Sequence, residues 1–155
     1  MPSDVHVVVS PRASGACTTV YASLVASAER HPEQTYLVDG DQSVTYAELV
    51  EQVDDAAGRL AALGVRPGDR VVLWLPNGRR WAELLFACAR LGAVVVPAGT
   101  RLRTIDLRHI LRHAQARVLI YTPRALGVDF ERQVAALLRD RAVGALPDLE
   151  HLVST

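Results

Sequence analysis

The chain has 155 residues, of which 50% are hydrophobic and 22% are charged, a composition typical of a globular domain with its own core. Its 17 basic and 17 acidic residues give a formal net charge of zero, so the overall charge indicates neither a nucleic acid nor an anionic membrane as partner. Every basic residue is an arginine, which excludes any mechanism that needs a lysine of this chain.

The sequence shows no evident membrane-spanning segment or signal peptide. The apolar runs are too short to span a bilayer, and no basic leader precedes the first of them, Val5–Val9, so we expect a cytoplasmic protein without a signal peptide. Cys17 and Cys88 are not spaced as a CxxC pair, which predicts free thiols and no metal or disulfide framework.

The first 17 residues show no periodic pattern apart from Val5–Val9, and we expect them to form an N-terminal tail or a short strand. The folded part is expected over residues 18–155. Thr18 or Thr19 is a suitable N-cap for a helix that ends near His31, before a proline.

Next, two short runs, Tyr36–Val38 and Ser43–Thr45, flank an Asp-Gly turn and predict a β-hairpin. Thr45 and Glu48 have the spacing of a capping box, so a helix is expected from there to Gly64. Tyr46 and Glu48 are conceivable substrate contacts, but capping already accounts for Glu48. The inward positions of this helix are expected to be Leu49, Val53, Ala56, Leu60 and Leu63.

A strand–helix–strand unit lies at the centre of the chain. The turn Pro67-Gly68-Asp69 precedes the continuous apolar run Val71–Leu75, which is typical of a strand buried on both faces. Asn77 is the expected N-cap of the following helix, which ends at Gly92, and Ala93–Val96 forms a second buried strand. Two such strands joined through a helix imply a parallel crossover. Cys88 falls on the apolar stripe, together with Trp81, Leu84, Leu85 and Leu91, which favours a buried structural cysteine.

The loop Ala98–Arg103 follows a parallel strand on its carboxyl side, where ligand crevices form in open α/β sheets, so Arg101 or Arg103 is a conceivable binding residue. Thr104 is the expected cap of the next helix, which runs to about Ala114. Three potential zinc ligands, Asp106, His109 and His113, share the polar face of that helix, where a solvated surface is the simpler interpretation.

The rest of the chain alternates in the same way. Arg117–Tyr121 predicts a third parallel strand, Phe130–Arg139 an amphipathic helix, and His151–Ser154 one more strand. Val134, Leu137 and Leu138 are expected to point inward from that helix. The predicted fold is α/β, a doubly wound and mostly parallel sheet with helices on both faces, plus a small β-hairpin near the N-terminus.

Three segments in the same order resemble the N-terminal part of the adenylate-forming (AMP-binding) superfamily, which holds acyl- and aryl-CoA synthetases, adenylation domains of nonribosomal peptide synthetases and luciferase. They are VDGDQSVTYAELV at Val38–Val50, VRPGDRVVLWLPN with the later RLGAVVVP, and TRLRTIDLRHILRHAQARVLIY at Thr100–Tyr121. The similarity covers residues 18 to 122 and continues loosely beyond them.

The resemblance implies an ATP-dependent acid–CoA ligase that converts a carboxylic acid to an acyl-adenylate with ATP and Mg²⁺ and transfers it to CoA or a carrier-protein thiol. The family's phosphate loop ending in Pro-Lys-Gly, its nucleotide-binding motifs and its catalytic lysine are not in this sequence. We therefore nominate no catalytic, cofactor-binding or metal-binding residue and expect the chain alone to be inactive.

The resemblance also implies a partner, either the remainder of the adenylation domain or a second polypeptide, and it allows a homodimer. Apolar surface is expected where that partner packs, at Leu146–Val153 and on the first helix. Two alternatives stay open. One is a stand-alone truncated homologue that acts as a non-catalytic binding partner. The other, which ignores the resemblance, is a flavodoxin- or receiver-like module, although no GxGxxG, P-loop or GxSxG motif is found.

Overall fold

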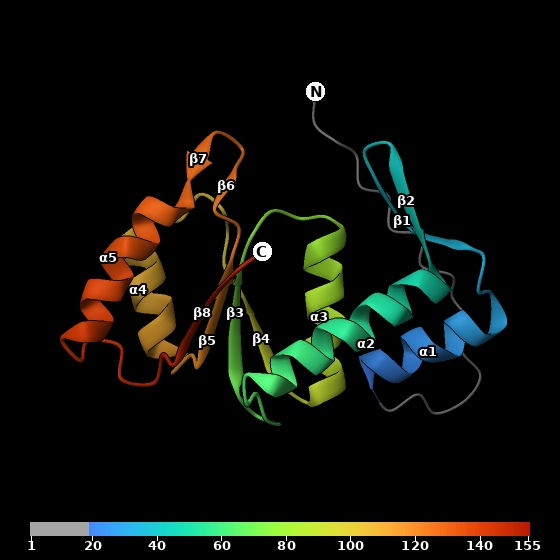
Figure 1. Cartoon of the computed structure of the whole chain (residues 1–155), viewed down its shortest axis with the longest axis horizontal. Helices are drawn as coiled ribbons and strands as arrows, with labels where there is room; N and C mark the ends of the chain where they lie inside the picture. Colours follow the sequence, from blue (N-terminus) through green and yellow to red (C-terminus); the bar gives the residue numbers. More distant parts are fainter. Residues whose placement is uncertain (1–18) are drawn as a thin grey trace. The chain divides into compact units, whose positions relative to one another are not determined.

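The computed structural model describes residues 19–155, so the predictions for Val5–Val9 and Thr18 fall outside it. The described chain forms two compact units. Unit 1 holds residues 19–64 and 77–91, and unit 2 holds residues 65–76 and 92–155. Figure 1 shows the elements of each unit, and the chain passes between the units three times.

Unit 1 contains three helices and a hairpin. Helix α2 packs against both α1 and α3, and the antiparallel strands β1 and β2 form the predicted hairpin, with Gly40 at a φ of 61° in its turn. Tyr36 of the hairpin makes edge-to-face contacts with Tyr46 and Phe86, at 5.3 and 5.9 Å between ring centroids. The bounds are α1 Val20–Arg30, β1 Thr35–Asp39, β2 Gln42–Thr45, α2 Tyr46–Ala62 and α3 Arg79–Leu91.

Helix α2 begins as its sequence predicts. The Thr45 hydroxyl accepts a hydrogen bond from the Glu48 amide at 3.2 Å, and the Glu48 carboxylate accepts one from the Thr45 amide at 2.9 Å. This reciprocal capping box satisfies two amides that would otherwise lack partners at the helix start. The capping interpretation of Glu48 is confirmed. Thr19 likewise caps α1 by accepting from the Ala22 amide at 3.0 Å.

Helix α3 begins differently from the prediction, because Asn77 is not its cap. The helix starts at Arg79, whose amide donates to the Asp39 carboxylate of the hairpin at 3.0 Å. Gly78 precedes it with a φ of 153°, and a Cβ there would lie 2.7 Å from the Asp39 Oδ2 atom. The cap is therefore supplied by a residue 40 positions earlier in the chain.

Glu83 of α3 is a buried charge that periodicity did not single out, with 5% of its surface exposed. Its carboxylate forms ion pairs with Arg80 on the same helix and, at 3.4 Å, with Arg59 of α2. The two arginines keep 42% and 61% of their side chains exposed, so their charges stay solvated while Glu83 is neutralised. The cluster ties α2 to α3.

Unit 2 is built on a four-stranded parallel sheet in the order β4-β3-β5-β8, with helices α4 and α5 packed against each other. Strand β8 coincides with the predicted segment. A second hairpin, whose strands β6 and β7 have two residues each, was not predicted. The bounds are β3 Arg70–Trp74, β4 Val94–Pro97, α4 Thr104–His113, β5 Val118–Tyr121, β6 Arg124–Ala125, β7 Val128–Asp129, α5 Phe130–Ala142 and β8 His151–Ser154.

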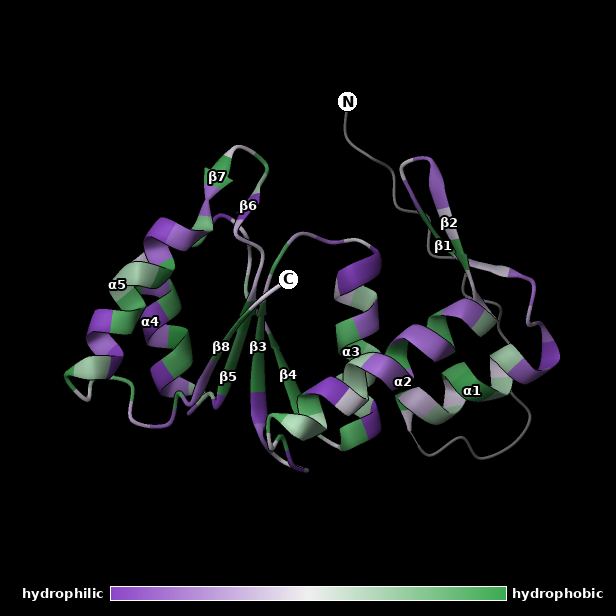
Figure 2. Cartoon of the chain, viewed as in Figure 1, coloured by the Kyte–Doolittle hydropathy of each residue, from purple (hydrophilic) through white to green (hydrophobic). Residues whose placement is uncertain are grey.

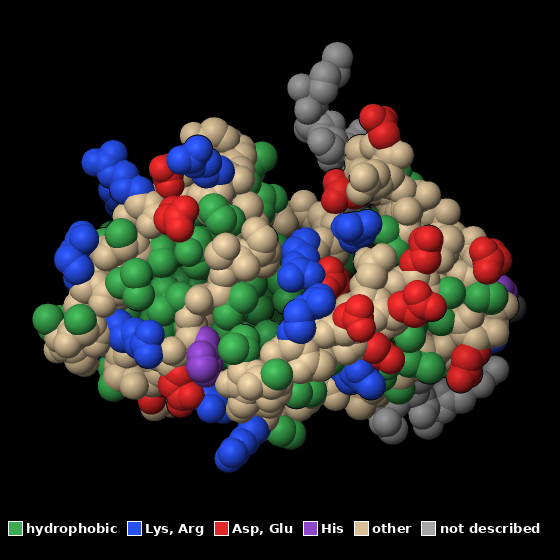
Figure 3. All heavy atoms as spheres, in the orientation of Figure 1, with side chains coloured by type: hydrophobic (Ala, Val, Ile, Leu, Met, Phe, Trp, Pro, Cys, Tyr) green, Lys and Arg blue, Asp and Glu red, His purple; other side chains and the backbone are tan. Residues whose placement is uncertain are grey.

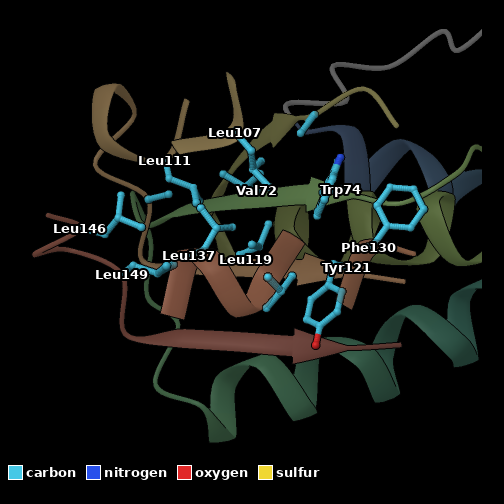
Figure 4. Packing of buried hydrophobic residues seen from close by; sticks show 13 residues of the cluster. Val72, Trp74, Leu107, Leu111, Leu119, Tyr121, Phe130, Leu137, Leu146 and Leu149 are labelled. Carbon is cyan, nitrogen blue, oxygen red and sulfur yellow. The ribbon is translucent and has the colours of Figure 1, made fainter. Parts of the chain in front are cut away.

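The core of unit 2 lies between the sheet and the α4–α5 layer. Figure 2 shows β3, β4 and β5 coloured hydrophobic along most of their length, whereas α4 and α5 alternate. In Figure 4 the labelled leucines gather at one end of the cluster, and Trp74, Tyr121 and Phe130 lie at the other, towards which the β3 and β8 arrows point. The residues of β3 and β5 that face away from this cluster are buried as well, so the α/β prediction of a parallel sheet with its strands covered is confirmed for these two.

Strand β4 corrects one prediction. Its apolar run resembles that of β3, and burial on both faces was expected, but Val94 is 50% exposed because β4 is an edge strand of the four-stranded sheet. Leu138, expected to point inward from α5, is 48% exposed. The inward residues of α5 are Phe130, Val134 and Leu137.

The apolar surface expected at Leu146–Val153 is largely absent, because Leu146 and Leu149 are each only 3% exposed and belong to the unit 2 core. On the first helix, Val20 is 57% exposed, in line with the expectation for that segment. Within residues 19–155, none of the helices is long and apolar enough to cross a membrane.

Candidate functional site

The carboxyl edge of the parallel sheet in unit 2 is the candidate site, because ligands of open α/β sheets bind there. The strand ends are in register: Trp74 of β3 is paired with Tyr121 of β5, and Tyr121 with Ser154 of β8. Leu73 of β3 is paired with Pro97, the last residue of β4. Four strands therefore end at one level, and the segments that follow them share this edge.

Trp74 fixes the loop that follows β4. Its indole N–H donates to the Gly99 carbonyl at 3.2 Å, and the Ala98 amide donates to the Leu73 carbonyl at 2.9 Å. Trp74 itself is fully buried and meets Phe130 edge to face, with 4.6 Å between ring centroids and an interplanar angle of 83°. A rigid aromatic residue thus positions a loop that carries the two arginines singled out from the sequence.

Arg101 and Arg103 both lie on this loop and are exposed. Arg103 is the N-cap residue of α4, and its amide donates to the Asp106 carboxylate at 3.1 Å while its guanidinium lies 3.7 Å from the same oxygen. Arg101 makes no ion pair with the described residues. Thr104 is not the cap as expected, because its hydroxyl bonds instead to the Gln133 amide oxygen of α5 at 3.3 Å.

Two threonine hydroxyls at the ends of adjacent strands are additional members of the edge that sequence analysis did not identify. Thr122 follows β5 and Thr155 follows β8, and their hydroxyl oxygens lie 3.0 Å apart. The Thr155 amide also donates to the Tyr121 carbonyl at 3.0 Å. They are separated by 33 positions in sequence, so only the parallel pairing of β5 with β8 brings them together.

Tyr121, the last residue of β5, directs its phenol into the core of unit 2. Burial raises the pKa of Tyr121, and the negative charge of Glu131 raises it further, so the phenol is neutral near pH 7. The β6–β7 hairpin follows the strand, with Leu126 at its tip in the left-handed region at a φ of 54° and 74% exposed.

The predicted metal alternative does not assemble as a three-ligand group. His109 and His113 stack on the exposed side of α4, with ring centroids 5.8 Å apart, but Asp106 is engaged with the Arg103 amide at the helix start. Within residues 19–155, no three or more histidine, cysteine, aspartate or glutamate side chains lie close enough together to hold a metal ion. The Arg112 guanidinium places a positive charge at the last turn of α4, where cations are favourable.

Cys88 of α3 is fully buried, as its position on the apolar stripe predicts, and burial raises the pKa of its thiol to about 12. We expect a Cys17→Ser variant to show no reaction with a thiol reagent at pH 8 until it is unfolded in urea, when one thiol reacts. Because the folded pKa is raised above the ordinary 9.0, the stability associated with the neutral thiol is complete below pH 9 and is lost as pH rises towards 12. Rapid labelling of the native variant would contradict this assignment, and a Cys88→Ser variant reports the Cys17 thiol alone.

In chemical terms the edge offers guanidinium groups and hydroxyls, which bind anionic oxygens such as those of carboxylates and phosphates. It offers no lysine, and the nearby carboxylate of Asp129 is occupied, because it caps α5 by accepting from the Arg132 amide at 3.1 Å. The described edge can therefore hold and orient an anion, while a proton-transfer group or a nucleophile is not evident among its residues.

A family model for AMP-binding enzymes matches residues 24–154, nearly the whole described chain. The chain belongs to the AMP-binding enzyme family. Within this family, a feruloyl-CoA synthase of an Amycolatopsis species is 43% identical over 117 residues, covering 76% of this chain and 23% of that enzyme. A 3-[(3aS,4S,7aS)-7a-methyl-1,5-dioxo-octahydro-1H-inden-4-yl]propanoyl:CoA ligase of Mycobacterium tuberculosis is 41% identical over 135 residues, covering 87% of this chain and 25% of that enzyme.

Solved structures are similar over nearly the same share of this chain. The inhibitor-bound N-terminal domain of FACL13 from Mycobacterium tuberculosis matches with a TM-score of 0.76 at 27% identity, covering 88% of this chain and 33% of that one. The chain spans about a quarter of the length of the curated relatives it matches. The resemblance stated from three sequence segments is therefore confirmed, and it extends beyond residue 122 to residue 154.

Proposed function

We propose that this chain is the N-terminal portion of an ATP-dependent acid–CoA ligase and that it is inactive alone. In the proposed reaction an oxygen of the carboxylic acid attacks the α-phosphorus of ATP, and the bond to the β-phosphate breaks to release pyrophosphate. The thiol of CoA then attacks the acyl carbon, and AMP leaves. The observation that carries the proposal is family membership over residues 24–154, combined with ligases among the relatives.

The role of this chain in that reaction is to support the site rather than to supply its reacting groups. Transfer at the α-phosphorus needs neutralisation of charge and precise positioning. The chain has no lysine, and its sheet edge supplies groups that can hold an anion. These are the two arginines of the loop positioned by Trp74 and the threonine hydroxyls that follow β5 and β8. ATP, Mg²⁺ and the thiol acceptor are proposed to be held mainly by the remainder of the adenylation domain or by a second polypeptide.

The test is a chimera. The aligned portion of the Amycolatopsis feruloyl-CoA synthase is replaced by this chain, and acid-dependent exchange of pyrophosphate into ATP is measured with ferulate. We expect exchange within about tenfold of the parent enzyme, since substitutions that keep the scaffold cost little transition-state stabilisation. The chain alone is expected to show no exchange above the background of a reaction without enzyme.

Two controls make the result interpretable. The parent enzyme with the same portion deleted measures whether the portion is needed, and ATP binding by the chimera reports whether it has folded. A folded chimera that binds ATP but forms no adenylate would overturn the proposed ligase role and favour the alternative of a non-catalytic interaction partner. Exchange catalysed by the chain alone would overturn its inactivity.

A further inference from the structure

The zero net charge of the chain conceals a separation of charge between the two units. The described part of unit 1 holds nine acidic residues and five arginines, whereas unit 2 holds seven acidic residues and eleven arginines. The formal net charges are therefore −4 and +4. Such asymmetry between parts of a chain indicates interaction surfaces that the total charge does not reveal.

In unit 1 the excess charge is concentrated on α2. Glu48, Glu51 and Asp55 are all exposed and lie three and four positions apart, which places them along one side of the helix, a set that we call the acidic stripe. Figure 3 shows acidic side chains gathered over α1 and α2. Glu51 and Asp55 form no ion pair with any described residue, whereas the neighbouring Asp54 pairs with Arg90 at 2.9 Å.

In unit 2 the matching feature lies on α5. Arg132 and Arg139 are exposed and seven positions apart, which places them on one side of the helix, and we call this pair the basic stripe. Figure 3 shows basic side chains along the outer side of α5. Neither arginine forms an ion pair within residues 19–155, whereas Asp140 of the same helix is neutralised by Arg108 of α4 at 2.7 Å.

We propose that the acidic stripe of one copy of this chain binds the basic stripe of a second copy, head to tail. The spacing supports this pairing, because Glu48 to Asp55 and Arg132 to Arg139 each span seven residues, or about 10.5 Å of helix. A second copy is favoured over an unrelated polyanion because each copy offers both stripes and carries no net charge that would repel another copy.

The geometry of such pairing has a measurable consequence. The two stripes are different surfaces, so each contact is heterologous, and an open assembly keeps one acidic and one basic stripe unoccupied at its ends. Association then continues beyond two copies as the concentration rises. A homodimer formed through one self-complementary apolar face would instead stop at two.

The first experiment measures the weight-average mass of the chain by sedimentation equilibrium up to about 1 mM protein, a concentration suited to weak contacts. At about 0.01 M salt, where charges act over about 30 Å, we expect the mass to rise steadily above 16.8 kDa with concentration. At about 1 M salt, where the range falls to about 3 Å, the mass should return to that of one chain. A mass that stays at 16.8 kDa in both buffers, or one that reaches a salt-independent plateau at two copies, would overturn the proposal.

The second experiment exchanges the charges. One variant carries Glu51→Arg and Asp55→Arg, and the other carries Arg132→Glu and Arg139→Glu. Neither should self-associate, because each presents two stripes of the same sign. An equimolar mixture should associate at low salt, because the new basic stripe of the first variant meets the new acidic stripe of the second.

Matched controls separate the stripes from net charge alone. Glu29→Arg with Asp41→Arg, and Arg101→Glu with Arg124→Glu, reverse the same number of exposed charges elsewhere in each unit. If the mixture of control variants gains mass as strongly as the stripe mixture, the attraction is one of net charge and the proposal fails. Binding of polyglutamate by Arg132 and Arg139 without any self-association would likewise overturn it and assign the basic stripe to an acidic partner. Circular dichroism spectra verify that each variant is folded.

Discussion

Replacing Trp74 with alanine is expected to lower the free energy of unfolding by about 4 kcal/mol, in the range for a large aromatic residue removed from a core. Trp74 is fully buried, with none of its surface accessible to water. It packs against Phe130 at the start of α5. Alanine would leave a cavity there, release the loop after β4 and remove the donor to Gly99. Urea denaturation followed by circular dichroism measures the loss.

The Trp74→Phe variant distinguishes packing from the hydrogen bond. It keeps an aromatic ring against Phe130 and loses the indole N–H, and the Gly99 carbonyl belongs to an exposed residue that water can reach. The expected loss is therefore only about 1 kcal/mol for the hydrogen bond plus a smaller packing term. Equal losses for the two variants would mean that the ring does not carry the stability that its burial indicates.

Gly78→Ala is expected to destabilise the chain by about 3 kcal/mol, through two effects that act together. An alanine at a φ of 153° costs about 1 to 2 kcal/mol in backbone strain, and its Cβ would lie 2.7 Å from the Asp39 carboxylate. Moving Asp39 away removes its bond to the Arg79 amide, a cap worth about 1 kcal/mol. Thermal and urea unfolding measure the total.

A mutant cycle tests this explanation of Gly78. Asp39→Ala alone should cost about 1 kcal/mol, and in the Asp39→Ala background Gly78→Ala should cost less than in the parent, because the clash is gone. Gly58→Ala is the matched control: Gly58 lies in α2 with open space around its Cβ position, so alanine should stabilise by about 0.5 to 1 kcal/mol. Additive losses in the cycle would show that Asp39 and residue 78 do not interact.

Local signals were sufficient for much of the fold. The run Val71–Leu75 lies between a turn and a proline and is apolar at every position, whereas a half-exposed strand alternates apolar and polar residues. This pattern predicted β3. The Thr45–Glu48 box and Gly92, at a φ of 69°, mark helix ends through interactions that span three or four residues or a single backbone angle. Each of these features is encoded within one short window of sequence.

The features that were missed depend on partners far away in the sequence. The cap of α3 comes from Asp39, and the exposure of β4 follows from the order of strands in the sheet, which the apolar run Ala93–Val96 does not specify. The β6–β7 hairpin was not predicted because Leu126 occupies a left-handed tip position where asparagine or glycine is the usual signal.

The candidate site was predictable only as a location. The loop Ala98–Arg103 follows a predicted parallel strand, which placed a possible binding site at the carboxyl edge of the sheet. Thr122 and Thr155 could not be paired in advance, since their contact requires β5 and β8 to be neighbours in register.

The two units are interleaved along the sequence, which limits where the chain can be cut into fragments. Unit 1 contains α3, yet α3 is encoded between β3 and β4 of unit 2, so neither unit corresponds to one uninterrupted stretch of gene. A cut after Gly64 would separate α2 from Glu83 and from the helix it packs against, and would leave the apolar side of α3 on the other fragment without that cover. Expression boundaries and circular permutants of this region should therefore keep residues 19 to 91 together with the strands on either side of α3.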